Sequence, residues 1–390
     1  MPPVPDRSAG ALRVALVTET YPPEVNGVAM TIGRLVDGLL SRGHSVHLVR
    51  PRQHAAEERR REGPLSETLV RGIPIPRYDS LKAGLPTFGA LRRAWLRDRP
   101  DIAHIATEGP LGWSALNAAL GLGIPVSTGL HTNFHSYSSH YGLGLLLGPI
   151  YRYLRWFHNR AACTMVPTES LRASLAADGF RNLAVVSRGV DTVLFDPRHR
   201  SAPLRTCWGA EGDAPVALYT GRLAPEKNLA LVLSTWRAMR AQDPRTRLVL
   251  VGDGPARSAL EASEPDVVFA GMRRGVDLAT HYASADFFLF PSLTETFGNV
   301  TLEAMASGLA VVAFDYAAAA EHIDNDRSGV RVIFGDATAY TRAAVELLAD
   351  RERARCVRVG AFDHTRRIDW ENVVGVFEAC LRRISANRVN

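Results

Sequence analysis

Short apolar runs alternate with helical segments along this chain, and this alternation limits its possible folds more than any other feature. Near the amino end, apolar strands are predicted at residues 13–17 and 45–49, and the helix between them, over 31–41, ends at Gly43. Strands that alternate with helices form parallel sheets, because each helix returns the chain across one face of the sheet. The pattern therefore predicts an α/β protein.

The alternation falls into two halves. A polar, proline-bearing stretch that follows Arg188-Gly-Val-Asp191 and runs to about residue 203 is predicted to link them. At about 150 residues per domain, the length of the chain also favours two domains. We expect a first domain over 1–188, a second over 189–366 and a C-terminal helix within 367–390. Further strands are predicted at 102–105, 126–130, 163–166 and 184–187 in the first domain, and at 216–220, 247–251, 267–270, 286–290 and 310–314 in the second.

Composition places the chain among soluble globular proteins. Hydrophobic residues make up 46% of it and charged residues 22%, which are ordinary values for that class. The four cysteines form no C-x-x-C pair, which argues against a zinc site or a disulfide framework and favours a reducing cytosol. The amino end lacks the apolar core of a signal peptide, and no apolar run reaches the roughly 18–20 residues that span a bilayer. We therefore expect a cytoplasmic protein.

The segment from Pro291 to Gly308 carries two carboxylates eight positions apart, Glu295 in a loop and Glu303 near the start of a helix. The turn between them opens that helix, whose first N–H groups are unpaired and suit a phosphate. Carboxylates accept paired hydrogen bonds from vicinal hydroxyls such as those of ribose or a hexose. The segment can therefore hold a nucleotide-sugar. The alternative is an ordinary helix start with acidic residues in its first turn, which the helix dipole favours.

A second segment, Gly221-Arg-Leu-Ala-Pro-Glu-Lys-Asn228, follows the strand predicted at 216–220. Its Arg222 and Lys227 thus stand at the carboxyl end of a strand, where ligands bind in open α/β sheets. The only lysines of the chain are Lys82 and Lys227, so a lysine beside an arginine suggests a compact charge that contacts a phosphate. The alternative is a solvated turn with incidental charges.

With Val251-Gly-Asp-Gly-Pro255, these two segments resemble those of retaining GT-B glycosyltransferases of glycosyltransferase family four. The resemblance runs from about residue 12 to the last helix. Through residues 19–28 and 130–135, the chain is most similar to bacterial α-mannosyltransferases and to sulfoquinovosyl- and glucosyl-lipid synthases. The resemblance implies two Rossmann-like parallel-sheet domains that face each other across a cleft. The first would bind the acceptor, the second would bind the nucleotide-sugar, and the C-terminal helix would cross back to the first.

The resemblance also implies roles for individual residues. Arg222 and Lys227 would stabilise the departing diphosphate, and His131 would contact the transferred sugar. Glu295 would bind the sugar hydroxyls and Glu303 the ribose hydroxyls. These implied catalytic residues are His131, Arg222, Lys227 and Glu295. The implied donor-binding residues are Gly27, Arg188, Gly221, Gly252, Met272, Phe297, Gly298, Asn299 and Glu303, and those on the acceptor side are Tyr21 and Asn26.

Neither a metal nor another cofactor is expected, because in GT-B enzymes arginine and lysine generally neutralise the diphosphate. A metal set of His131, His135 and His140 is conceivable, but no acidic fourth ligand is spaced for it. Residues 21–28 lack the G-x-G-x-x-G fingerprint of dinucleotide-binding proteins, which argues against an NAD enzyme. No protein nucleophile is obvious, and a leaving-phosphate oxygen could deprotonate the acceptor on the same face of the sugar.

The sequence indicates less about the acceptor than about the donor. The predicted helix over 149–160 combines Arg152, Arg155 and Arg160 with four aromatic residues, a mixture that suits an anionic membrane surface. The alternative is a core helix whose arginines face water. The net charge of +6 has three explanations, namely nucleic acid, a membrane surface or an arginine-rich genome. Since no nucleic-acid-binding module is visible, we expect no nucleic acid partner.

The expected reaction is transfer of a hexose to a lipid or lipid-linked acceptor on the inner face of the cell membrane. The resemblance favours mannose from GDP-mannose as the transferred hexose. One alternative is a UDP-sugar-dependent transferase that acts on a glycerolipid or on a soluble sugar or polysaccharide. Another is a GT-B protein without transferase activity, either an epimerase-like enzyme or a nucleotide-sugar binder. An epimerase would convert the donor alone into a new nucleotide-sugar.

Overall fold

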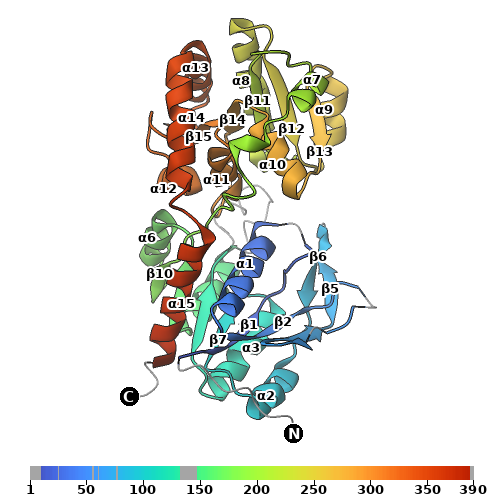
Figure 1. The fold of residues 1–390 in the computed structure, drawn as a ribbon. Helices are drawn as coiled ribbons and strands as arrows, with labels where there is room; N and C mark the ends of the chain where they lie inside the picture. The colour runs from blue at the N-terminus through green and yellow to red at the C-terminus, as the bar shows by residue number, and fades with distance from the viewer. Residues whose placement is uncertain are drawn as a thin grey trace. The chain divides into compact units, whose positions relative to one another are not determined.

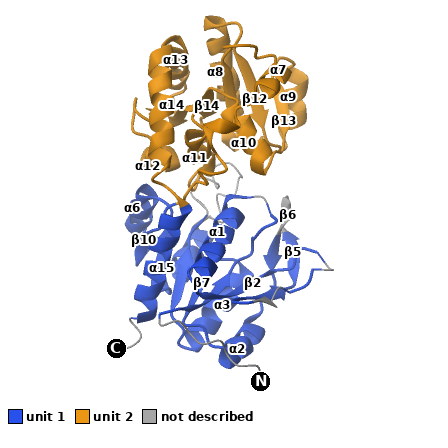
Figure 2. Ribbon diagram, viewed as in Figure 1, with its two compact units in different colours: residues 1–132, 143–187, 370–390 blue, residues 133–142, 188–369 orange. Residues whose placement is uncertain are grey.

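The computed structural model describes residues 10–24, 26–54, 57–59, 61–75, 78–131 and 147–386. The chain forms two compact units (Figure 2). Unit 1 comprises residues 1–132, 143–187 and 370–390, and unit 2 comprises residues 133–142 and 188–369. Each unit is built around its own sheet (Figure 1). Within the described residues, no helix is both long enough and apolar enough to cross a membrane.

Unit 1 contains an eight-stranded sheet in the order β10-β9-β8-β7-β1-β2-β4-β3 and a separate two-stranded sheet of β5 and β6. In the large sheet all neighbours are parallel except β3 and β4. The strands are β1 (Arg13–Val17), β2 (Ser45–Pro51), β3 (Arg61–Glu62), β4 (Leu65–Val70), β5 (Gly72–Ile75), β6 (Tyr78–Gly84), β7 (Ile102–Ile105), β8 (Val126–Gly129), β9 (Cys163–Val166) and β10 (Leu183–Val185). The helices are α1 (Gly27–Ser41), α2 (Phe88–Arg97), α3 (Pro110–Gly121), α5 (Leu147–Asn159), α6 (Glu169–Ala177) and α15 (Trp370–Ala386).

Strand β1 at the centre of the unit 1 sheet is apolar from Val14 to Val17, because helices cover both of its faces. Val14 and Leu16 of β1 belong to one hydrophobic cluster, which includes residues of α1 and α15. Ala15 and Val17 belong to another, which includes residues of α2 and α3. Successive side chains of a strand point to opposite faces, so a strand covered on both sides has no polar face. Figure 1 shows α1 and α15 side by side.

Unit 2 is built on a six-stranded sheet in which every pair is parallel, in the order β13-β12-β11-β14-β15-β16. One hydrophobic cluster forms its core. Its strands are β11 (Val216–Thr220), β12 (Arg247–Val251), β13 (Val268–Gly271), β14 (Phe287–Phe290), β15 (Ala310–Phe314) and β16 (Val330–Val332). The helices are α7 (Ala202–Cys207), α8 (Leu229–Gln242), α9 (Arg257–Ser263), α10 (Gly275–Ala283), α11 (Asn299–Ala306), α12 (Ala317–His322), α13 (Ala337–Ala349) and α14 (Arg351–Thr365).

The strand order of unit 2 reverses between β11 and β14. The chain runs outward through β11, β12 and β13, and then returns to place β14 on the other side of β11. Loops at the carboxyl ends of two such strands diverge in opposite directions, and the crevice between them is where open α/β sheets bind ligands. The two loops in question follow Thr220 and Phe290.

The α/β prediction is confirmed, and each predicted strand corresponds to a strand of one sheet or the other. Five strands differ from their predicted bounds by one or two residues at an end. β2 extends to Pro51 rather than to residue 49, β8 ends at Gly129 rather than at residue 130, and β10 covers Leu183–Val185 rather than 184–187. β13 covers Val268–Gly271 rather than 267–270, and β14 begins at Phe287 rather than at residue 286. The strands between residues 61 and 84 and the short strand β16 were not predicted.

Candidate active site

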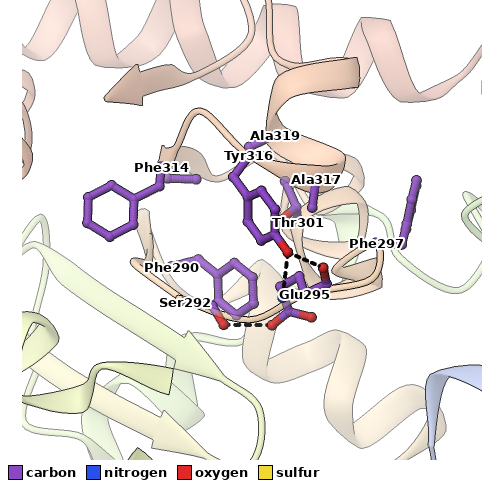
Figure 3. A pocket seen from close by; sticks show the side chains of 10 residues that line it. Phe290, Ser292, Glu295, Phe297, Thr301, Phe314, Tyr316, Ala317 and Ala319 are labelled. Carbon is purple, nitrogen blue, oxygen red and sulfur yellow. Dashed lines mark hydrogen bonds between the residues drawn. The ribbon is translucent and has the colours of Figure 1, made fainter. Parts of the chain in front are cut away.

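The two segments that the sequence singled out in the second half meet where the strand order of unit 2 reverses. The Lys227 ammonium forms an ion pair with the Glu295 carboxylate and donates to the backbone oxygen of Thr294 at 3.2 Å. The hydroxyl of Ser292 donates to the same carboxylate at 2.8 Å (Figure 3). Each charged side chain is 15% exposed, so the pair is shielded but reachable.

Local backbone geometry places Lys227 at the end of its loop. Pro225–Lys227 forms a 3₁₀ turn, and Asn228 adopts a left-handed conformation with φ 55° before α8 begins. Asparagine tolerates this conformation better than most residues. Arg222, earlier in the same loop, has a more open side chain at 39% exposure, and its Nη1 lies 3.8 Å from Oε1 of the buried Glu226. The loop therefore presents one shielded and one accessible cation.

Glycines allow the loops after β11 and β12 to touch through their backbones. Gly252 has φ 139°, and a Cβ atom there would lie 1.9 Å from the Gly221 backbone oxygen. A Cβ on Gly254 would lie 2.4 Å from the Leu223 oxygen. Both distances are far inside van der Waals contact, so loop packing alone requires glycine at these two positions. This structural reason for Gly252 is independent of any contact with a ligand.

Helix α11 begins at a residue that cannot cap it with a side chain. Gly298, its N-cap, adopts φ 89°, and Asn299 is the first helical residue. The first-turn N–H groups of such a helix suit an anion. Phe297, the preceding residue, fixes the loop: its side chain is buried, its ring contacts His322 at 5.7 Å, and its backbone oxygen accepts from the N–H of Ala318 at 2.7 Å.

Glu303 lies one turn further along α11. Its Oε2 accepts a hydrogen bond of 2.9 Å from the Tyr282 hydroxyl of α10. Desolvation raises the pKa of Glu303 to about 7, although the Tyr282 hydrogen bond opposes the shift. Tyr282 is fully buried, and burial together with the Glu303 charge raises its own pKa. A carboxyl group that titrates near neutral pH therefore lies within this loop cluster.

The other predicted residues of unit 2 lie at its periphery or in its interior. Met272 directly follows β13 and is 52% exposed. Arg188 is buried, which lowers the pKa of its guanidinium to about 10. A buried arginine is costly unless other groups compensate its charge. Those groups can belong to the protein as well as to a donor, so the burial of Arg188 fits a structural role as well as a donor contact.

Unit 1 holds the remaining four predicted residues. Asn26 caps α1, and its Oδ1 accepts from the N–H groups of Val28 and Ala29 at 3.1 and 2.8 Å. Gly27 is the first residue of that helix. The ring of the buried Tyr21 lies 5.6 Å from the Arg50 guanidinium carbon.

His131 follows β8 in unit 1, and its imidazole folds back over Gly129, where a Cβ atom would lie 2.5 Å from Nε2. Gly129 therefore leaves the space that this ring occupies. His135 and His140 lie outside the described residues. Within the part of the chain that the structure describes, no group of three His, Cys, Asp or Glu side chains could hold a metal ion.

Sequence reasoning missed an acidic pair in unit 1. Glu19 follows β1 and Glu108 follows the adjacent β7. Oε1 of Glu19 accepts from the N–H of Leu111 at 2.9 Å. Burial is the largest cause that raises the pKa of each carboxyl group to about 7, and the charge of Glu19 adds to the effect at Glu108. Tyr282 and Tyr316, which bond to Glu303 and Glu295, were also missed because no sequence pattern marks them.

Two family descriptions match this chain: "Glycosyltransferase Family 4" over residues 25–194 and "Glycosyl transferases group 1" over residues 214–350. A GDP-mannose-dependent alpha-mannosyltransferase of Mycolicibacterium smegmatis is 33% identical over 385 residues, which cover 96% of this chain and 99% of the relative. An alpha-monoglucosyldiacylglycerol synthase of Streptococcus pneumoniae is 27% identical and covers 77% of this chain and 71% of its own length.

Among solved structures, the sucrose-phosphate synthase of Thermosynechococcus elongatus has a TM-score of 0.80 at 20% identity and covers 96% of this chain and 100% of its own. That likeness concerns the fold. The expected family, two-domain α/β fold and enzyme class are thereby confirmed. The chain belongs to glycosyltransferase family 4, it has the GT-B fold, and it is a hexosyltransferase.

Proposed function

We propose that this enzyme transfers mannose from GDP-mannose, with retention of configuration, to a lipid or lipid-linked acceptor. The relative from Mycolicibacterium smegmatis is named for GDP-mannose and α-mannosyl transfer. The relative from Streptococcus pneumoniae is named as a synthase of a glucosyl diacylglycerol. The observation that carries the proposal is the meeting of Lys227 and Glu295 at the switch point of unit 2.

In this proposal, unit 2 binds the donor. Lys227 and Arg222 neutralise the diphosphate, and the first-turn N–H groups of α11 bind its oxygens. Glu295 accepts hydrogen bonds from the hydroxyls of the hexose. Glu303, which Tyr282 holds at 2.9 Å, accepts those of the ribose. The two carboxylates are binding groups, so neither serves as a nucleophile.

Unit 1 contributes Tyr21 and Asn26 on the acceptor side, and His131 contacts the transferred sugar. The nucleotide-sugar is a substrate, and no resident cofactor is assigned. A leaving-phosphate oxygen takes the proton of the acceptor hydroxyl on the same face of the sugar. The bond from the anomeric carbon to the diphosphate breaks, and one from that carbon to the acceptor oxygen forms.

A thermal-shift screen against GDP, UDP, ADP and their hexose conjugates tests the donor assignment. We expect GDP and GDP-mannose to raise the melting temperature, because a ligand at 100 times its Kd stabilises a one-site protein by about 2.7 kcal/mol. A shift confined to UDP compounds would replace the donor with a UDP-sugar. No shift with any nucleotide would contradict the proposed donor site.

The exposed side chains of helix α5 support a location at a membrane surface. Its buried residues include Leu154 and Phe157, whereas Arg152 is exposed and Trp156 is 42% exposed. The Arg160 guanidinium lies 5.2 Å from the Trp156 ring. An exposed tryptophan among arginines suits the interface of an anionic bilayer. We propose that the face of α5 that carries Arg152 and Trp156 contacts the inner leaflet of the cell membrane.

Flotation with vesicles that contain anionic phospholipid tests this location. We expect the protein to float at low salt and to remain unbound at high salt, since the attraction is screened. Arg152→Gln should lower partitioning about fivefold, because an arginine near such a surface contributes about 1 kcal/mol. The matched control is Arg342→Gln, an exposed arginine on α13 of unit 2. Equal partitioning of the two variants would contradict the assignment of this face.

A further inference from the structure

The turn between β15 and α12 braces the loop that carries Glu295. The Tyr316 hydroxyl donates to the backbone oxygen of Glu295 at 2.5 Å and accepts from the backbone N–H of the same residue at 3.3 Å (Figure 3). Two residues later, the N–H of Ala318 donates to the backbone oxygen of Phe297 at 2.7 Å. Ala317 between them adopts φ 52°. The turn thus bonds to the loop on both sides of Thr296.

The side chain of Tyr316 is itself held in place. Its ring contacts that of Phe334 at a centroid distance of 5.3 Å. It lines a small pocket with Phe290 and Phe314, and Ser292 and Glu295 lie on the same pocket (Figure 3). Aromatic packing fixes the ring, so the hydroxyl meets the Glu295 peptide from a set position. Removal of the hydroxyl alone would leave this packing in place.

The Glu295 carboxylate has different partners from the Glu295 backbone. Its carboxylate contacts Lys227 and Ser292, whereas its main-chain N–H and C=O contact Tyr316. If Lys227 is to neutralise a diphosphate, its ion pair with Glu295 must be shared or broken when the donor arrives. The loop then loses a side-chain attachment. The main-chain attachment to Tyr316 is not changed by that exchange of partners.

We infer that Tyr316 is a positioning residue: its hydroxyl holds the main chain of Glu295 in place while the carboxylate exchanges Lys227 for the hydroxyls of the donor sugar. The inference rests on the proposed function of this loop. Misplacement of a binding group by about 1 Å can cost a hundredfold in rate. A support for the Glu295 main chain therefore affects the sugar, which Glu295 is proposed to bind, more than the nucleotide, whose proposed contacts are other residues of unit 2.

The test compares Tyr316→Phe with Tyr340→Phe. Tyr340 is a matched control, because its hydroxyl also donates to a backbone oxygen of unit 2, that of Val312 at 2.8 Å. We expect Tyr316→Phe to lower kcat with GDP-mannose about tenfold and to reduce the preference for GDP-mannose over GDP-glucose. The Kd for GDP should stay within twofold of the wild-type value. Tyr340→Phe should retain kcat and the donor preference.

Hydrogen exchange supplies a readout that needs no turnover. The Glu295 N–H should exchange faster in Tyr316→Phe than in the wild type and should be unchanged in Tyr340→Phe. If the wild type turns over GDP-mannose and the two variants have the same kcat and donor preference, the positioning role is wrong. If the wild type turns over no nucleotide-sugar, the proposed function fails instead. An unchanged exchange rate of the Glu295 N–H in Tyr316→Phe would mean that the Tyr316 hydroxyl does not hold this peptide, whether or not the wild type is active.

Discussion

The Lys227→Ala variant should lose about 100- to 1000-fold in kcat, because loss of one preorganised donor to a developing negative charge has an effect of that size. The Lys227 ammonium is shielded and is directed by Glu295 and by the backbone oxygen of Thr294. Once the bound donor has taken over the Glu295 carboxylate, this charge needs no further reorganisation when the diphosphate departs. Steady-state rates with GDP-mannose and a lipid extract as acceptor measure the effect. Near-normal turnover would contradict the assignment of Lys227.

The variant also leaves the Glu295 carboxylate without its cation, and this second effect must be separated from the first. The double variant Lys227→Ala/Glu295→Gln removes both charges. If Lys227 acts on the diphosphate, the double variant stays at least as slow as Lys227→Ala. Recovery of kcat in the double variant would mean that the unpaired carboxylate caused the loss. Arg237→Ala is the control for loss of a cation, because Arg237 is 55% exposed in an ion pair with Glu264.

The clearest strands that sequence reasoning found, such as β11 and β15, have nearly continuous apolar runs, because burial on both faces leaves little room for polar side chains. Strand β4 was missed for the opposite reason. Its sequence includes Glu67, whose charge argues against burial. Glu67 is nevertheless buried, since Nη2 of Arg50 lies 3.2 Å from its Oε1 and compensates the charge. The pairing of Arg50 with Glu67 depends on strand order, which local sequence does not contain. Strand β16 was missed because its three residues, Val330–Val332, have an arginine in the middle and so form no apolar run.

The candidate site shows the same limit. The rule that ligands bind at strand ends directed attention to Lys227 and Glu295, which are 68 residues apart in sequence. Their contact follows from the adjacency of β11 and β14, which no periodicity reveals. Tyr282 and Tyr316 had no signal at all, because an aromatic residue next to a strand or within a helix is ordinary core material. Their roles come from single hydroxyl groups.

Donor binding should weaken about tenfold as the pH falls from 8 to 6, because Glu303 has a pKa raised to about 7 and each pH unit below the pKa reduces the ionised fraction tenfold. The ionised carboxylate accepts hydrogen bonds from both ribose hydroxyls, whereas the protonated group loses the charge assistance. Calorimetric titration with GDP-mannose is the measurement, since its phosphates carry no titrating proton in this range. Glu303→Gln should bind about 10- to 100-fold more weakly at pH 8 and show no such pH dependence.

Glu303 should make the unliganded protein more stable as the pH falls, whereas it makes donor binding weaker. A carboxyl group whose folded pKa lies above its unfolded value of 4.5 binds more protons when folded, so it stabilises the fold increasingly as the pH falls from about 7 to 4.5. The shift corresponds to about 3 kcal/mol. His104 and His158, whose pKa values burial lowers to about 3, act in the other direction in wild type and variant alike. The difference in unfolding free energy between wild type and Glu303→Gln therefore isolates Glu303. If that difference stays constant over this range, the pKa of Glu303 is not raised, and the pH dependence of donor binding must come from another group.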